Sequence, residues 1–429
     1  RDLTLTGVRR LLVVSVLALV LGAVADARTI RPLPKTWEKG MNVVAFRWDE
    51  LSGPRFGFTG SAALLLVRPD RALFVTRWIQ YWNDPLRGDD LSATDINPAY
   101  GSPEACRRHP KVEYTRCQTP STAALRKALL YAQRQGMQVG LKPLVDVGRN
   151  GRNTVDRARV AFQDDAERAK WFDSYRVMMA EYARLARDVE AELLVVGTGL
   201  TKMADGLADQ AEWRRLIDDI RSGVLMGDGR GGFTGRLTYA ARWDDIFDDA
   251  EVLETHGFFW DALDVIGIEG FWPLINGRDP EHDNPSVGRL RDGWRNNFLK
   301  GGVPPGFALN NLNAEYDKPV VLTGLGYLSR GGTSAAPFNG DYAQAAVGGR
   351  VNAVAQARPY RAAFDFWSGV ARSRKWFHGI YWWNWQPPLG TVENNGDYTP
   401  QGKPAERELC LRHLGRNSKS CRPSPMPKR

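Results

Sequence analysis

The sequence predicts an α/β protein that folds as a closed barrel of eight parallel β-strands, a (β/α)8 or TIM barrel. Short, continuous apolar runs recur along the chain, which is typical of parallel strands buried on both faces. Amphipathic helical patterns separate most of these runs. The chain has 429 residues, of which 43% are hydrophobic and 25% charged. That is long enough for a barrel of about 250 residues with insertions.

The predicted strands are distributed over most of the chain. They cover Met41–Trp48, Ala72–Tyr81, Met137–Val147, Leu193–Thr198, Leu237–Trp243, Leu263–Glu269, Val320–Leu322 and Gly379–Trp385. Thr119 and Pro120 predict a helix start, as N-cap and first helical residue, and Gly136 predicts its end. Periodic apolar residues predict further helices over about 165–190 and through Trp213.

The N-terminus carries the pattern of a secretory signal peptide. Arg9 and Arg10 precede an apolar run, Leu11–Ala25, which closes on the small-residue site Ala25-Asp26-Ala27. The alternative is a membrane anchor, but the run is shorter than the ~20 residues that a spanning helix needs. We therefore expect cleavage after Ala27, no stable membrane insertion afterwards, and a secreted protein, either extracellular or periplasmic.

Four domain segments follow from these patterns. We predict a signal peptide at 1–27, a short linker rich in basic residues and proline at 28–40, one barrel at 41–406, and a basic tail at 407–429.

The four cysteines form two pairs of equal spacing. Cys106 lies near Cys117, and Cys410 lies near Cys421. Four cysteines allow three pairings, and two local disulfides are the simplest arrangement in an oxidising compartment. Neither pair is C-x-x-C and no histidine lies at ligand spacing to another, so we expect no metal site.

The chain is basic, with 58 Lys and Arg against 49 Asp and Glu, a formal net charge of +9. Basic proteins often bind nucleic acid. Here the charge is scattered and the predicted export removes the protein from nucleic acid. A solvated surface with weak attraction to acidic polysaccharide or cell envelope is the favoured interpretation.

One stretch, Lys318–Tyr327 (KPVVLTGLGY), has the pattern of a buried strand that opens into a glycine-containing turn. It resembles the seventh strand of glycoside hydrolase family 113, a group of (β/α)8 barrels related to the β-mannanases. In that family the motif ends Thr-Glu-hydrophobic-Gly-Tyr, and the resemblance implies that the glutamate is the catalytic nucleophile. This chain has Gly324 at that position.

A second stretch, Leu193–Leu200 (LLVVGTGL), resembles the fourth strand of the same family. There the motif ends Gly-Thr-Glu, and the glutamate supplies the acid/base. This chain has Gly199 instead. The resemblance extends from about residue 39 to 406, so the flanks match while both catalytic carboxylates are absent.

The resemblance implies retaining hydrolysis of β-linked mannose or related hexose polymers through a covalent glycosyl-enzyme, without a cofactor. Retention requires two carboxyl groups ~5–5.5 Å apart, and loss of a principal catalytic residue costs about 10⁴–10⁶ in rate. We therefore expect a monomer that binds a β-mannan-like polysaccharide or oligosaccharide, with hydrolysis lost or severely impaired.

Aromatic residues near the predicted strand ends supply ring faces on which sugars stack. The plain alternative is that some of them only fill the top of the barrel. The candidate substrate-binding residues are Trp48, Asp49, Trp82, Asp146, Trp243, Trp272, Tyr327, Trp383 and Trp385.

Glu269 ends the sixth predicted strand, next to the seventh. A substrate-positioning role is the favoured interpretation, and substitution for a missing catalytic residue is the alternative. Two other functions therefore stay open. One is an active glycosidase that uses Glu269 and a strand-end aspartate. The other is a non-enzymatic envelope protein whose basic surface binds acidic polymers.

Overall fold

The computed structural model describes residues 30–46, 50–51, 61–81, 96–97, 119–149, 152–162, 164–246, 258–296, 303–338, 349–386 and 396–423. The predicted signal peptide, the Cys106–Cys117 pair and the candidate residues Trp48, Asp49 and Trp82 lie outside these ranges. Within them, no helix is both long and apolar enough to cross a membrane.

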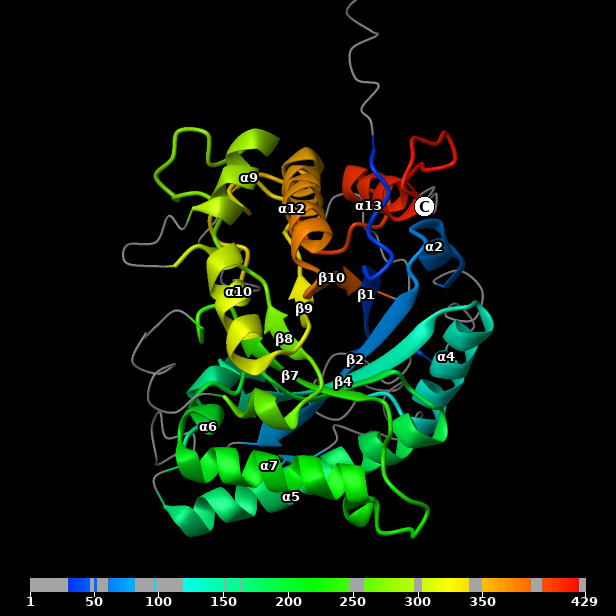
Figure 1. The fold of residues 1–429 in the computed structure, drawn as a ribbon, viewed down its shortest axis with the longest axis vertical. Helices are drawn as coiled ribbons and strands as arrows, with labels where there is room; N and C mark the ends of the chain where they lie inside the picture. Colours follow the sequence, from blue (N-terminus) through cyan, green and yellow to red (C-terminus); the bar gives the residue numbers. More distant parts are fainter. Residues whose placement is uncertain are drawn as a thin grey trace, which may run out of the picture.

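Eight parallel strands form a closed barrel, which confirms the predicted fold (Figure 1). In ring order they are β1 (Glu38–Val44), β2 (Arg71–Tyr81), β4 (Gln138–Arg149), β6 (Leu193–Thr198), β7 (Arg236–Arg242), β8 (Ile266–Glu269), β9 (Val320–Leu325) and β10 (Phe377–Trp385). Pairing of β10 with β1 closes the ring. Two short strands, β3 (Ile96–Asn97) and β5 (Arg152–Val155), add antiparallel to β2 and β4. Each predicted strand overlaps one barrel strand.

Helices surround the barrel. They are α2 (Ser61–Leu66), α4 (Thr122–Arg134), α5 (Asp165–Asp188), α6 (Lys202–Asp205), α7 (Leu207–Ser222), α9 (Val287–Arg295), α10 (Pro305–Tyr316), α12 (Ala353–Arg374) and α13 (Pro404–Leu414). Short 3-10 turns cover Arg157–Arg159, Val224–Met226 and Phe259–Ala262. The outward faces of the strands pack against these helices in one large apolar core.

The predicted start of α4 at Thr119 and Pro120 was wrong. The N-cap is Ser121, whose Oγ accepts a hydrogen bond from the Ala124 amide at 3.2 Å. Thr119 lies two residues before this cap, where its hydroxyl donates to the Arg77 carbonyl of β2 at 2.6 Å. The helix therefore starts at Thr122.

Two of the three predicted domain boundaries, 40/41 and 406/407, fall inside the folded body. Trp37 is buried and β1 begins at Glu38, so the last residues of the predicted linker belong to the barrel. Residue 406 lies within α13, which packs against α12. The predicted Cys410–Cys421 disulfide is present, and it is buried beside Ile30.

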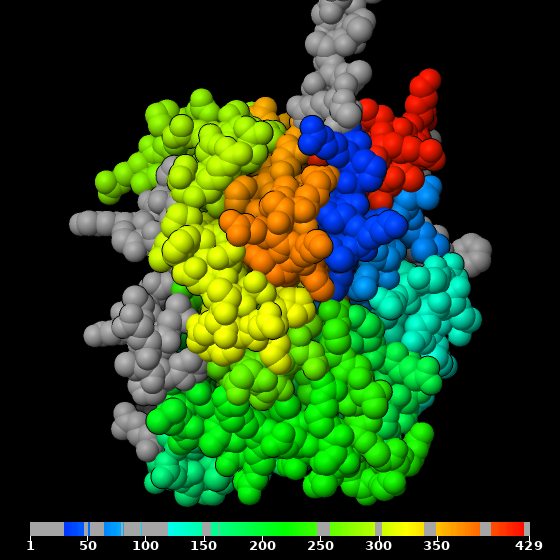
Figure 2. All heavy atoms as spheres, viewed as in Figure 1, coloured from blue at the N-terminus to red at the C-terminus, as the bar shows by residue number. Residues whose placement is uncertain are grey.

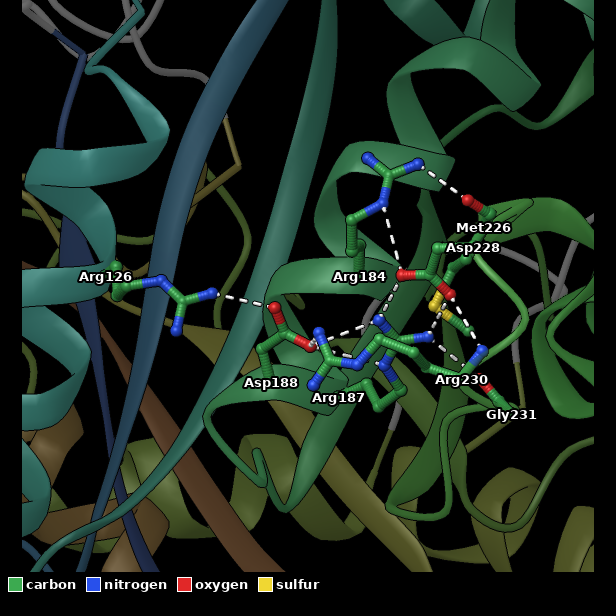
Figure 3. A network of polar contacts seen from close by, with 8 residues as sticks. All are labelled: Arg126, Arg184, Arg187, Asp188, Met226, Asp228, Arg230 and Gly231. Atoms are coloured by element: carbon green, nitrogen blue, oxygen red, sulfur yellow. Dashed lines mark hydrogen bonds and ion pairs between the residues drawn. The ribbon is translucent and has the colours of Figure 1, made fainter.

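Salt bridges tie the outer helices together (Figure 3). Asp188 at the end of α5 accepts from Arg126 of α4 at 2.9 Å, and Arg187 reaches Asp228 at 2.5 Å. Arg230 also lies 3.1 Å from Asp188. In this network two aspartates, Asp188 and Asp228, are shared by the arginines, so each arginine has a carboxylate partner.

A buried ionic cluster fills the barrel where the strands begin. Glu38 accepts from Arg236 at 2.9 Å and from the Tyr381 hydroxyl at 2.7 Å, and lies 3.4 Å from Arg71. An apolar layer inside the barrel separates this cluster from the opposite mouth. That layer comprises Leu73, Leu193, Val195, Ala240, Val265, Val321 and Tyr381.

Replacing Glu38 should therefore destabilise the barrel. Glu38→Ala removes the most deeply buried acidic partner of Arg71 and Arg236, and we expect a loss of about 3–5 kcal/mol in the free energy of unfolding. Urea denaturation followed by circular dichroism measures it. The control is Asp165→Ala. The Asp165 carboxylate is highly exposed, so this substitution should lower the free energy of unfolding by less than about 0.5 kcal/mol. Equal losses in the two variants would contradict the importance of the cluster.

Candidate functional site

An ion pair lies inside the barrel close to the carboxyl ends of the strands, where barrels of this type place their sites. Lys142 on β4 donates to Glu269 on β8 at 2.6 Å and to the Thr323 carbonyl on β9 at 3.2 Å. The Thr323 hydroxyl donates to the same carboxylate oxygen at 2.9 Å. Asn42 on β1 donates to the Thr323 carbonyl as well, at 3.0 Å. Four strands are thus joined by one polar group of residues.

Lys142 has no exposed surface. Its burial lowers the pKa of the ammonium below the ordinary value, and the neighbouring Glu269 opposes that shift. The charge of Lys142 therefore depends on the carboxylate of Glu269.

Gly324 lies directly beside this ion pair. β8 and β9 pair with Glu269 opposite Gly324, at a register shift. A Cβ atom on residue 324 would be 2.8 Å from both carboxylate oxygens of Glu269. Real Cβ atoms do not approach other atoms so closely, so Glu269 occupies the space in which any side chain at 324 would begin.

Gly199 has a different neighbour. Its φ of +58° lies in the left-handed region, where an L-residue costs about 1–2 kcal/mol. A Cβ atom there would be 3.4 Å from Cγ of Arg242 on β7. Arg242 is held in place by Asp244 at 2.8 Å and Asp156 at 2.5 Å.

The ring order explains this arrangement. Gly199 follows β6 and Gly324 lies on β9, with β7 and β8 between them. Each intervening strand directs one charged side chain toward its neighbour, so Arg242 lies beside Gly199 and Glu269 beside Gly324. The two positions that lack a carboxylate are both lined by ion-paired side chains.

Asp146 at the end of β4 is fully engaged. It pairs with Arg157 and lies 3.3 Å from Arg77. Burial alone would raise the pKa of Asp146, but the two arginines outweigh it and the pKa is lowered. Its predicted contact with a sugar hydroxyl stays a prediction.

Asp245 is the strand-end carboxyl whose pKa is raised. Burial raises it to about 7, although the carboxylate accepts hydrogen bonds from the Thr201 hydroxyl at 2.7 Å and the Arg242 amide at 2.8 Å. Asp245 therefore lies beside the segment that follows Gly199.

Two of the candidate aromatic residues lie where ring surface is accessible: Trp383 is partly exposed itself, and Trp243 lies beside an exposed ring. Trp383 is half-buried, with the Lys142 ammonium 5.5 Å from its ring centroid. Trp243 is mostly buried, and its ring lies 5.4 Å from that of Phe338, which is 39% exposed.

The other candidates are buried. Trp272 packs edge-to-face against Trp294 at 5.7 Å, and Trp385 is also covered. Tyr327 packs against Tyr360 at 6.1 Å. For these three, sugar contact stays a prediction.

The Gly326 of the KPVVLTGLGY motif has a structural role. A Cβ atom at this position would be 2.1 Å from the Trp383 carbonyl oxygen. Glycine alone permits this approach of β9 to β10.

Several site residues were missed by the sequence interpretation. Lys142 is one of them, and a lysine within an apolar strand is the signal that could have marked it. Phe46, over which Arg77 lies at 4.6 Å, comes shortly before the candidate Trp48 in the sequence. Phe338 lies in a loop without periodicity, and no sequence signal marks it. Throughout the described ranges, no group of three or more His, Cys, Asp or Glu is placed to hold a metal ion.

Comparison with known proteins places the chain in a family. The model of Glycoside Hydrolase Family 113 matches residues 104–403, well over half of the sequence. This chain belongs to glycoside hydrolase family 113. No curated protein sequence matches it.

Solved structures agree with the fold of this family 113 protein. The complex structure of a GH113 β-1,4-mannanase aligns at a TM-score of 0.63 and 22% identity, covering 88% of this chain and 99% of that one. The β-mannanase AaManA of Alicyclobacillus acidocaldarius, in complex with ManMIm, aligns at 0.63 and 22%, covering 89% and 98%. A family 5 mannosidase of Rhizomucor miehei aligns at 0.50 and 10%, covering 90% and 98%.

The coupling free energy between Lys142 and Glu269 should be measurable in a double-mutant cycle. Glu269→Ala leaves a buried, unpaired ammonium, so we expect a loss of about 3–5 kcal/mol in unfolding free energy. Lys142→Met combined with Glu269→Ala should recover most of it. Additive losses in denaturant unfolding would contradict coupling between the two residues.

The same variants should differ in pH dependence. In Glu269→Ala the pKa of Lys142 falls further, while the unfolded lysine keeps its proton up to about pH 10.4. Between those two pKa values the unfolded state binds more protons, so stability rises with pH. Glu269→Ala should therefore gain more stability than the parent chain between about pH 7 and about pH 9.5. Lys142→Met/Glu269→Ala, which lacks the titrating group, should not show this gain.

Proposed function

We propose that this family 113 protein is an exported barrel of the β-mannanase type that binds β-linked hexose polysaccharide and hydrolyses it feebly or not at all. One observation carries the proposal. The positions at which the family resemblance expects a nucleophile and an acid/base are glycines, and ion-paired side chains from β7 and β8 lie against both.

The available carboxylate is poorly suited to attack a sugar. Glu269 is bound by Lys142 and by the Thr323 hydroxyl, so its use as a nucleophile would deprive a buried ammonium of its partner. Gly199 has no proton to donate to a leaving group. The two-carboxylate route of retaining hydrolysis therefore lacks its principal parts.

Ring faces remain available for binding. Trp383 and the Trp243–Phe338 pair offer apolar surfaces near the strand ends, and sugar C–H faces pack on such rings. The protein would need no cofactor and would act as a monomer. Export is supported by the signal-peptide pattern and by the Cys410–Cys421 disulfide.

The proposal predicts binding without turnover. We expect isothermal titration of mannooligosaccharides to give a measurable Kd, whereas reducing-end assays on mannan and assays on aryl β-mannosides give no turnover above background. Trp383→Ala should weaken binding, since a stacking ring contributes about 1 kcal/mol. The matched control is Trp376→Ala, which lies before β10. Ordinary turnover by the parent chain would refute the proposal.

Restoring the carboxylates should restore hydrolysis only when Glu269 is removed. Gly199→Glu with Gly324→Glu supplies both groups, but the new side chain at 324 starts 2.8 Å from the Glu269 oxygens. Adding Glu269→Gly vacates that space for the side chain introduced at position 324. We expect turnover from the triple variant and much less from the double variant. A folded triple variant that binds mannooligosaccharide without turning it over would contradict this reasoning.

One observation favours a second candidate, an active glycosidase. Glu269 forms an ion pair with Lys142, while burial raises the pKa of Asp245 to about 7, and two carboxyl groups in such different environments are typical of catalytic pairs. Both Glu269→Gln and Asp245→Asn would then abolish turnover without abolishing binding. Under the first proposal there is no turnover for either substitution to remove.

A further inference from the structure

Exposed cations gather on one face, at the end of the barrel where the strands begin. They come from three segments: the stretch before β1, the carboxyl end of α12, and the stretch after α13. We call this the basic face. It consists of Arg31, Lys35, Arg372, Arg374, Lys375, Arg416, Lys419 and Arg422, all of them exposed.

Several contacts hold the three segments together. Arg372 donates to the Pro32 carbonyl at 2.8 Å, and Gly415 lies so close to Pro32 that a Cβ atom there would be 3.0 Å from its Cα. Ile30 packs on the Cys410–Cys421 disulfide, which fixes the stretch after α13. Figure 2 shows the stretch before β1, in dark blue, between α12 in orange and the α13 region in red.

The charges of this face are not neutralised. In the described part of the chain, none of the eight cations forms an ion pair, because the nearby Asp365 and Glu408 are already bound by Arg412 and Arg361. The network of Figure 3 is the opposite case, since each of its arginines lies within ion-pair distance of an aspartate. The crowding has an electrostatic consequence: partial burial and the neighbouring Arg31 and Arg412 lower the pKa of Arg372.

Charge is distributed unevenly around this end of the barrel. The turns that lead into β6 and β8 carry Glu190, Glu192, Asp261 and Asp264. The basic residues are therefore concentrated near β10 and β1 rather than spread as a uniform coat. A localised field of one sign is what attracts a polymer of the opposite sign.

The residue composition of the basic face limits the classes of partner that it could bind. Among the described residues, none of the exposed large apolar side chains belongs to the three segments. A face that docks on a membrane interface presents apolar residues for insertion, and one that binds single-stranded nucleic acid presents aromatic rings for base stacking. A hydrophilic polyanion, recognised mainly by its charge, is the partner that suits this face better, since arginine pairs well with planar carboxylates.

We propose that the basic face binds an acidic polysaccharide whose carboxylates pair with these arginines and lysines. The face lies at the opposite end of the barrel from the strand ends that carry Gly199 and Gly324, so this second glycan site is separate from the mouth and does not depend on the function proposed for it.

The test uses the full chain and polygalacturonate as the probe. A variant that removes one cation from each segment, Arg31→Gln/Arg374→Gln/Lys419→Gln, is compared with Arg215→Gln/Arg230→Gln/Arg278→Gln, which removes the same charge from exposed arginines elsewhere. We expect the first variant to raise the Kd roughly 100-fold and the second less than about threefold. Binding of the parent chain should weaken steeply with salt, whereas mannooligosaccharide binding at the mouth should change in neither variant.

Several outcomes would overturn the proposal. Equal losses in the two variants would show that net charge, not this face, attracts the polymer. Binding to polygalacturonate that ignores salt would exclude a charge-based contact. Tighter binding to vesicles of anionic phospholipid, or to single-stranded DNA, than to polygalacturonate would assign the face to a different partner. A melting temperature that is unchanged in both variants would exclude misfolding as the cause of weaker binding.

Discussion

The mouth of this barrel depends on the ion pair between Lys142 and Glu269. An ammonium without any exposed surface is tolerated only if a carboxylate compensates its charge and its remaining protons find acceptors. Glu269 supplies the charge, and the Thr323 carbonyl supplies a second acceptor. The geometry of the mouth follows from this requirement, because Glu269 must lean toward the barrel axis to reach Lys142.

Glycine at 324 leaves the Glu269 carboxylate where it stands, whereas a larger residue would require that carboxylate to shift. The carboxylate of Glu269 lies where a side chain on β9 would begin. The ion pair and the glycine at 324 are therefore linked by a steric relation rather than only by their proximity. At Gly199 the link is weaker, since Arg242 lies beside the position without overlapping it, and the left-handed backbone is the main obstacle to a side chain.

Glycines at positions 199 and 324 need not affect the fold, because the barrel is stabilised elsewhere. Its interior is closed at the opposite end by the cluster around Glu38, above which lies an apolar layer. The outer faces of the strands pack on the helices. A family 113 barrel can thus keep its architecture while the residues at its mouth change, as is expected when function is carried by strand ends and loops.

The strands could be predicted from the sequence because parallel strands buried on both faces leave continuous apolar runs. That signal is local, so even the limits of β6 were predicted correctly. Thr119 was misassigned as a helix cap because it is held to β2, by a hydrogen bond from its hydroxyl to the Arg77 carbonyl, a contact that the sequence around α4 does not show. The sequence by itself also determined that positions 199 and 324 carry no carboxylate. Only the tertiary structure decided what lies beside them, since Lys142, Arg242 and Glu269 come from separate strands whose register and closure bring them together.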